Sequence, residues 1–160
     1  MKNEEYMVYT YKHRKIVMYL ANKYIKGDNK KLLEHIKYHD LDKLFMYMFY
    51  DKKDVSIMHR KLSFHHDNDK PKTYEDYVEM VLDWESARYT KPDKPLNAYD
   101  TLYRYFSHME DKILPILDEF NIKGTNLPME QDTLEYANSL IVTKDEIKKE
   151  MSEYLNKYFS

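Results

Sequence analysis

The chain has 160 residues and a mass of 19.6 kDa, which is enough for one domain with a single buried core. Its 26 Lys and Arg residues nearly balance its 28 Asp and Glu residues, so the formal charge is −2 and non-specific nucleic-acid binding is not expected. Cysteine is absent, which excludes disulfides, thiolate catalysis and cysteine-ligated metals. No apolar run is long enough to span a membrane, and the N-terminus lacks the apolar segment of a secretory signal. We therefore expect a cytoplasmic protein with no membrane partner.

Glycine and proline are scarce, with only 2 and 5 residues. Few positions can then adopt the positive φ angles of tight hairpins, so an all-β fold is not expected. These residues instead separate segments in which apolar side chains recur every three or four positions. The pattern predicts an all-α fold, a single compact domain of six to eight helices over residues 1–160.

The first half of the chain predicts four helices, which run from about 4 to 26, from 28 or 29 to 35, from 37 to 50, and from 55 onward. Gly27 is expected to stop the first helix, because glycine tolerates the left-handed conformation that ends helices. Asp28 or Asn29 can cap the second helix and Asp54 the fourth, since short oxygen-bearing side chains accept from free backbone N–H groups.

The second half begins with a loop predicted at 67–72. Thr73 is expected to cap the fifth helix, with Asp76 three residues later in a capping-box-like pattern. A loop at 90–95 precedes a long helix predicted from 97 to 120 and disturbed at Pro115. After a connection at 124–128, further helices are expected at 130–140 and after Thr143. The last helix has an apolar stripe of Ile147, Met151, Leu155 and Tyr158.

The histidines carry the strongest chemical signal. Six of the seven lie in the first 66 positions, namely His13, His35, His39, His59, His65 and His66. Asp40 follows His39 directly, and Asp83 lies in an apolar helix beside Trp84, where an unpaired carboxylate costs several kcal/mol. Imidazole and carboxylate together suit Mn, Fe, Co, Ni or Zn. His35 and His39 would form a two-histidine zinc clip only if one helix contained both.

The order of these residues, H…HD…H…HH…D, resembles the HD superfamily of metal-dependent phosphohydrolases. The stretch 13–21, His-Arg-Lys-Ile-Val-Met-Tyr-Leu-Ala, is similar to the first motif of that family. The stretch 39–43, His-Asp-Leu-Asp-Lys, is similar to its His-Asp motif, although Asp42 stands where the family usually has glycine. The resemblance implies an HD-domain-like helical fold.

A closer resemblance is to a family of small bacterial and phage proteins of uncharacterised activity. Its members combine a His-Asp-x-x-Lys motif, a histidine-rich stretch ending in His-His, and Glu-Met-x-x-Asp-Trp, which correspond here to 39–43, 59–66 and 79–84. This resemblance covers a motif-bearing core at about 8–90. The helices at about 97–160 carry no site signal and are expected to complete the core or to support a homodimer.

The resemblance implies a cofactor of one or two divalent ions, from among Mn, Fe, Co, Ni and Zn. The first would be held by His13, His39, Asp40 and Asp83. Asp40 would then bridge to a second ion bound by His59 and by His65 or His66. The alternative is a single-metal site in which His65 or His66 acts as an acid or a base.

The resemblance further implies a metal-dependent phosphohydrolase acting on a nucleotide or a related phosphate ester. The metal would lower the pKa of a bound water to roughly 7, and a histidine free of metal could protonate the leaving group. The expected catalytic residues are Asp40, Lys43 and His66. Lys43 is the first candidate for contacting the phosphate, and the further candidates are Arg60, Lys61 and Arg88.

The sequence leaves the roles of the residues around this site undecided. Asp42 and Glu85 could orient ligand imidazoles or could face solvent. Trp84 is expected to pack in the core rather than to stack on a base, and the loop at 90–95 could form a rim over the pocket.

Two other functions remain open. Some HD-type folds with added histidines hold two irons and activate oxygen, so an oxygenase is one alternative. The other is a helical module, of the kind phages encode, that binds a nucleotide or a protein without catalysis. Sequence alone identifies neither the substrate nor the metal.

Overall fold

The computed structural model describes residues 2–91, 93 and 95–159, and these residues form helices and loops without a strand. The first half contains α1 (Glu4–Tyr24), α2 (Lys30–Lys37), α3 (Leu41–Met46) and α4 (Lys52–Leu62). The second half contains α5 (Tyr74–Thr90), α6 (Ala98–Tyr105), the 3-10 helix η1 (Ser107–Met109), α7 (Glu110–Glu119), α8 (Gln131–Ser139) and α9 (Lys144–Phe159). The predicted all-α class is confirmed, and the helices make up one domain.

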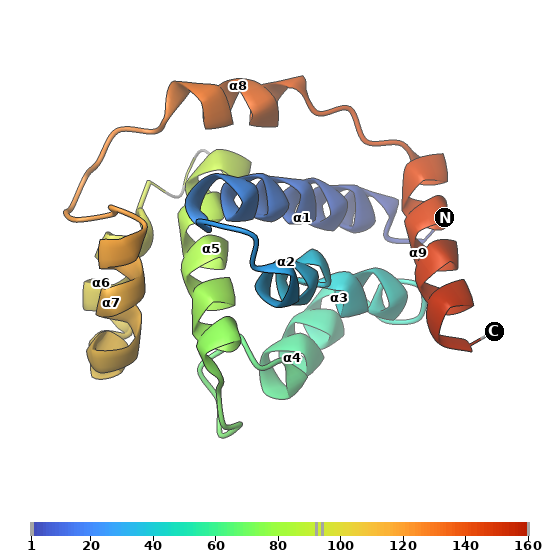
Figure 1. Ribbon diagram of the computed structural model, residues 1–160. Coiled ribbons are helices and arrows are strands. Elements are labelled where there is room, and N and C mark those ends of the chain that lie inside the picture. The colour runs from blue at the N-terminus through green and yellow to red at the C-terminus, as the bar shows by residue number, and fades with distance from the viewer. Residues whose placement is uncertain (1, 92, 94, 160) are drawn as a thin grey trace.

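Helices α1 and α5 cross at the centre of the molecule, and the other helices surround them (Figure 1). α1 contacts α2, α3, α8 and α9, and α5 contacts α2, α6, α7 and α8. In the view of Figure 1, α8 passes above α1, and α9 stands beside the N-terminus. None of the described helices is both long and apolar enough to cross a bilayer.

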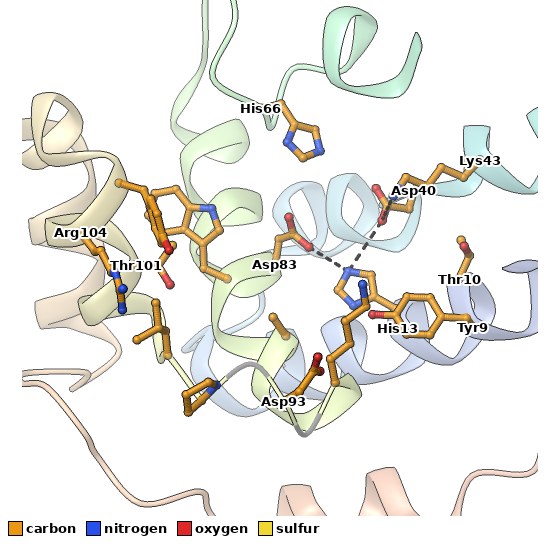
Figure 2. Close-up of a pocket in the computed structure, with 16 residues that line it drawn as sticks. Tyr9, Thr10, His13, Asp40, Lys43, His66, Asp83, Asp93, Thr101 and Arg104 are labelled. Atoms are coloured by element: carbon orange, nitrogen blue, oxygen red, sulfur yellow. Dashed lines mark hydrogen bonds and ion pairs between the residues drawn. The ribbon is translucent and has the colours of Figure 1, made fainter. Parts of the chain in front are cut away.

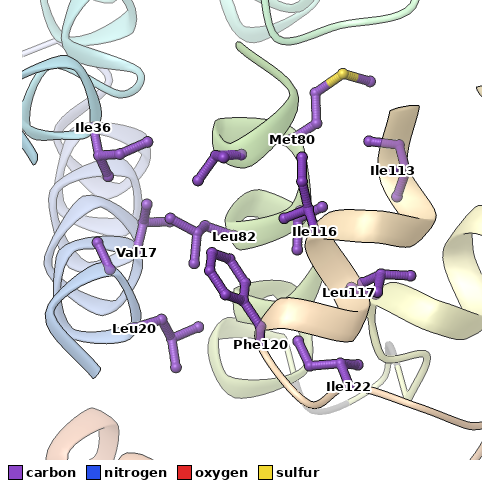
Figure 3. Packing of buried hydrophobic residues seen from close by; sticks show 14 of the residues in the cluster. Val17, Leu20, Ile36, Met80, Leu82, Ile113, Ile116, Leu117, Phe120 and Ile122 are labelled. Atoms are coloured by element: carbon purple, nitrogen blue, oxygen red, sulfur yellow. The ribbon is translucent and has the colours of Figure 1, made fainter. Parts of the chain in front are cut away.

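Two apolar clusters meet along α1. The larger lies between α1, α5 and α7 and includes Val17 and Leu117 (Figure 3). The smaller joins the start of α1 to α3 and α9 and includes Met7 and Ile147. His13 lies on α1 between these two clusters, and its side chain is buried. Its ring therefore enters the interior at the boundary between the two clusters.

Most of the predicted helix ends are confirmed by their capping contacts. The side chain of Asn29 accepts from the backbone N–H of Leu32 and so caps α2. The first helix, however, ends two residues earlier than predicted, because Ile25 is extended and caps it; Gly27, with a φ of +76°, lies beyond that end. Thr73 and Asp76 form a complete capping box at the start of α5, and the segments 67–72 and 124–128 are loops.

The predicted third helix, from 37 to 50, is wrong at its start. α2 continues to Lys37, and the chain then turns at Asp40, whose φ of 57° is left-handed. An α-helix cannot pass through a left-handed residue. Arg14 holds this turn, because its Nε donates to the carbonyl of His39 at 2.8 Å and its Nη2 to that of Lys37 at 2.7 Å. These bonds satisfy carbonyls that the end of α2 leaves without partners.

The fourth helix begins three residues earlier than predicted. Asp51, rather than Asp54, is its N-cap, and the Asp51 carboxylate accepts from the backbone N–H of Asp54 at 2.9 Å. Asp54 therefore lies in the first turn, where a negative charge is favourable beside the helix dipole.

The long helix predicted at 97–120 is in fact α6 and α7, joined by η1. The break occurs at Phe106, whose φ of −133° leaves the helical region, and whose ring stacks on Trp84 with centroids 4.8 Å apart. Helix α7 runs through Pro115. A proline removes one backbone donor, and the apolar packing of α7 against α5 outweighs that loss.

The last helix starts as predicted, because the hydroxyl of Thr143 accepts from the backbone N–H of Glu146. Only half of the predicted apolar stripe is buried. Ile147 and Met151 pack in the smaller cluster, whereas Leu155 and Tyr158 are 43% and 52% exposed. Burial along α9 therefore ends about halfway, beyond the part that covers α1.

Candidate metal centre

Four donor side chains from three segments gather where α1 meets α5. His13 comes from α1, His39 and Asp40 from the turn between α2 and α3, and Asp83 from α5. The Nε2 atom of His13 lies 2.8 Å from Asp83 Oδ1 and 3.1 Å from His39 Nε2. Asp40 Oδ2 lies 3.3 Å from His39 Nε2. The structure thus brings together the four residues expected to hold a first metal.

A second group lies on the other side of Asp40. His59 is near the end of α4, and His65 and His66 follow in the loop before α5. The Nε2 atoms of His59 and His65 are 3.2 Å apart, and they lie 2.9 and 3.1 Å from Asp40 Oδ1. The ring of His66 is 4.5 Å from that of His65. One oxygen of Asp40 therefore faces each group, as expected of a bridging carboxylate.

The contacts behind the rings show which nitrogen carries the proton. His39 Nδ1 lies 2.7 Å and His65 Nδ1 2.9 Å from Oε2 of Glu79. His59 Nδ1 lies 2.7 Å from Oδ2 of Asp42. An ionised carboxylate only accepts, so each Nδ1 is the donor. The Nε2 atoms therefore present lone pairs to the interior of the centre.

His13 has the same tautomer for a different reason. Its Nδ1 lies 3.4 Å from the hydroxyls of both Ser86 and Thr90. Those hydroxyls donate to the backbone carbonyls of Asp83 and Ser86, at 2.8 and 3.0 Å. Since each hydroxyl has only one proton, both can only accept from His13. Nε2 of His13 is thus also free to bind a cation.

With neutral imidazoles, the centre consequently brings acceptor atoms together without donors between them. Asp40 Oδ1 is buried and makes no hydrogen bond to a described residue, although His59 Nε2 lies 2.9 Å away. Lone pairs at such distances repel unless a cation stands among them. Imidazole nitrogen and carboxylate oxygen are ligands for first-row divalent metals. The residues present therefore fit the metal ions that the sequence predicts.

Protons replace those cations in the metal-free protein. Burial acts to lower the pKa of His39 and of His59, but the neighbouring carboxylates outweigh it and raise both values. The pKa of His65 rises to about 9, with Asp40 and Glu79 outweighing burial and the charge of His39. Burial acts to raise the pKa of Asp40, but the neighbouring imidazoles outweigh it and hold that pKa well below the usual range. The centre thus favours bound positive charge.

A cavity of about 560 Å³ opens beside this centre. Its lining includes His13, Asp40, His66 and Asp83, and Lys43, whose Nζ lies 3.8 Å from Asp40 Oδ2. The volume is in the usual range for small-molecule sites. Figure 2 shows Lys43 on one side of the metal ligands, with Arg104 and Thr101 of α6 on the opposite wall.

Aromatic side chains line part of the cavity, and residues of the segment at 90–95 form its rim. Tyr9, Trp84 and Tyr105 line it. Trp84 packs against the larger apolar cluster, as predicted, and also borders the cavity. The predicted rim at 90–95 is confirmed for Lys91, Asp93 and Pro95, which line the cavity, whereas positions 92 and 94 lie outside the described residues.

Three basic residues expected at the phosphate lie away from the centre. Arg60 and Lys61 are exposed on α4. Because the side chain of His59 points into the protein, the side chains of the two residues that follow it on the helix point to solvent. Arg88 is buried on a different face of α5 from Asp83, outside the cavity lining. The structure brings Lys43, but not these three, to the metal ligands.

The two carboxylates expected behind the imidazoles differ in role. Asp42 orients His59 while its own side chain is 42% exposed. As the second residue of α3, Asp42 has ordinary helical geometry, and glycine is not required there. Glu85 instead accepts from the backbone N–H of Ala98 at 2.9 Å, and burial raises its pKa.

Glu79 is the residue to which sequence reasoning assigned no role. It lies one turn before Asp83 on α5, and that spacing is the signal that could have identified it. Its Oε1 lies 2.8 Å from Nε2 of His35, on the side away from the metal ligands. His35 and His39 therefore reach different sides of Glu79, and the two-histidine clip does not form.

Comparisons of the chain with protein-family models, curated proteins and solved structures found no match. The likeness to HD-type proteins consequently rests on the order of the motif residues alone. The geometry of the donor atoms and the adjoining cavity provide the basis for a functional proposal.

Proposed function

We propose that the protein is a metal-dependent phosphohydrolase with an HD-type centre, acting on a nucleotide or a related phosphate ester. The observation that carries this proposal is the position of Asp40. Its two oxygens face separate groups of imidazole nitrogens, and the same carboxylate borders a cavity large enough for a small molecule. A carboxylate between two metal ions is a common arrangement for phosphate-ester hydrolysis.

The ligands divide into two sets that share Asp40. The first ion would be held by His13, His39, Asp40 and Asp83, and the second by Asp40, His59 and His65, with His66 as a further candidate. Bound divalent ions lower the pKa of water to roughly 7 and polarise a phosphoryl oxygen. The remaining chemistry belongs to the side chains around the cavity.

Lys43 is suited to neutralise a phosphate group. Burial acts to lower its pKa, but the carboxylates of Asp40 and Asp83 outweigh that effect and raise it. Its ammonium therefore stays charged beside the metal ligands, where it attracts an anionic substrate and stabilises the charge that develops during transfer.

His66 supplies a neutral imidazole at the cavity. Burial and the neighbouring His65 lower its pKa to about 3, so the ring is neutral at pH 7. This suits it to bind the second ion better than to act as a base, for which a pKa near 7 is best. Metal content separates these roles: His66→Ala should keep the second ion if His66 is the base, and should lose it if His66 is a ligand.

Aromatic rings at the opposite end support a nucleoside as the remainder of the substrate. Trp84 and Tyr105 line the cavity near Arg104. Flat rings beside a cation provide surfaces on which a base can stack. We expect the phosphate at Lys43 and the nucleoside toward α6.

Metal analysis of the wild type beside Asp40→Ala tests the proposal. We expect about two equivalents of a first-row metal in the wild type, and less than half of that in the variant, because Asp40 contributes to both sets. The matched control is Asp69→Ala, which removes an exposed carboxylate from the loop at 67–72 and should leave the metal content unchanged.

A positive result leads to hydrolysis assays on nucleoside phosphates with both variants. Turnover by the wild type and by Asp69→Ala, but not by Asp40→Ala, is the expected outcome. The three imidazoles of the second set favour an oxygenase as a second candidate, and bound iron with oxygen consumption would select it. Absence of metal after reconstitution would leave a helical binding module.

A further inference from the structure

Glu79 lies behind both groups of metal ligands. Its Oε2 is 2.7 Å from Nδ1 of His39, which belongs to the first group, and 2.9 Å from Nδ1 of His65, which belongs to the second. The residue is 6% exposed. A single carboxylate oxygen thus sets the ring orientation and the tautomer of one histidine in each group.

The position of Glu79 is itself fixed. It lies one turn before Asp83 on α5, so the same helix supplies a ligand and the group behind two others. Its second oxygen is paired with His35 at 2.8 Å, and His35 lies 3.3 Å from Asp76. Asp76 is anchored in the capping box of α5. Glu79 is therefore held from two sides and cannot turn without breaking several contacts.

Charge balance gives an independent reason for this arrangement. Two divalent ions carry four positive charges, whereas the ligands Asp40 and Asp83 supply only two negative ones. Glu79 and Asp42, each beside the Nδ1 of a ligand histidine, supply two more. A buried excess of charge is costly, so the carboxylates behind the imidazoles help to retain both ions.

We infer that Glu79 is a positioning residue shared by the two metal positions, so that its carboxylate is required for tight binding of both ions. The inference rests on the proposed metal centre. Asp42 provides the internal contrast, because it contacts only His59 of the second group. Loss of Glu79 should weaken both positions, whereas loss of Asp42 should weaken one.

Cobalt titrations followed by visible absorption test this inference. His59→Gln disables the second group and reports on the first, whereas His13→Gln disables the first and reports on the second. In each background we expect Glu79→Gln to weaken Co²⁺ binding by about 10- to 100-fold and to shift the cobalt spectrum. The amide oxygen can still accept from both Nδ1–H groups, but the side chain is neutral, so both bonds weaken and the negative charge behind the two rings is lost.

Asp42→Asn is the matched control in the same two backgrounds. It should weaken Co²⁺ binding when the second group is the reporter, and should leave the first unchanged. Circular dichroism of the metal-free variants verifies folding. Should Glu79→Gln fail to fold, Glu79→Asp is the replacement, because it keeps the charge but withdraws the carboxylate by one methylene. It is expected to weaken both positions.

The outcomes separate this inference from the proposed function. Glu79 variants that weaken only one position, or neither, would overturn the shared role. A wild type that binds no Co²⁺ would overturn both the shared role and the hydrolase. A wild type that binds two ions, loses affinity for both with Glu79→Gln, and hydrolyses no phosphate ester would support the shared role and contradict the hydrolase.

Discussion

Each imidazole that offers Nε2 to the centre has its other nitrogen committed to a neighbour. Carboxylates hold His39, His59 and His65, and two hydroxyls hold His13. This commitment determines the tautomer, so the candidate ligand atoms would already be arranged when a metal binds. Pre-arranged ligands lose less conformational entropy on binding than mobile ones do.

The charge of Lys43 gives a test at this scale. Lys43→Gln should keep the metal content of the wild type and lower turnover by about 100-fold, because a cation that stabilises developing phosphoryl charge is lost. The control is Lys61→Gln, at an exposed position outside the cavity, which should leave turnover unchanged. Equal turnover in wild type and Lys43→Gln would contradict the assigned role.

The ligands could be predicted from sequence, whereas their partners could not. His13, the His39–Asp40 pair and Asp83 follow from their types and order along the chain. The role of Glu79 depends on the reach of one carboxylate to rings on two other segments, and sequence spacing does not specify that reach. Arg60 and Lys61 were predicted from their proximity to His59, but neighbours on a helix point in different directions.

Among the secondary-structure elements, the turn between α2 and α3 decides whether the centre forms. A continuous helix there would point His39 and Asp40 about 100° apart around the axis, whereas the left-handed Asp40 lets both side chains reach the centre. Caps at Asn29 and Thr73 could be predicted, because they depend on local side-chain chemistry. The left-handed turn could not, because it depends on Arg14, which is distant in sequence.

Glu150 of α9 supports that turn through Arg14, since its Oε1 lies 2.6 Å from Arg14 Nη1. Glu150→Ala should lower the free energy of unfolding by about 1–3 kcal/mol, because a buried guanidinium loses a charged partner. It should also weaken metal binding, although α9 contributes no ligand. The measurement is urea unfolding together with a cobalt titration, with exposed Glu153→Ala as control. Destabilisation without weaker metal binding would limit Glu150 to a structural role.

For the molecule as a whole, the candidate metal centre joins parts of the chain that are distant in sequence. Helix α6 provides a wall of the cavity through Thr101 and Arg104, although residues 97–160 carry no motif. No sequence motif marks either residue as part of the cavity, because their contribution follows from the packing of α6 against α5. Tertiary placement of this kind is what spacing along a sequence does not reveal.

The stability of the metal-free protein should depend on pH in a defined window. The pKa of His65 is raised from about 6.5 to about 9, so the folded state binds this proton more tightly than the unfolded state. That contribution is fully present below pH 6.5 and is lost as pH rises through about 9. We expect the melting temperature with chelator to fall between pH 6.5 and pH 9.

Two comparisons check that expectation. With bound metal the decrease should be smaller, because metal replaces the proton at the same nitrogen. In His65→Gln the metal-free protein should lose less stability across the window, because one titrating group is absent. A metal-free wild type whose melting temperature is constant from pH 6.5 to pH 9 would contradict the raised pKa.

The link between Arg14 and Glu150 also bears on the order of events during synthesis. The ribosome makes the His39–Asp40 turn long before α9, which begins at Lys144. Until α9 emerges, Arg14 lacks its ion pair with Glu150. The nascent chain should therefore have weak affinity for metal, and tight loading should follow release.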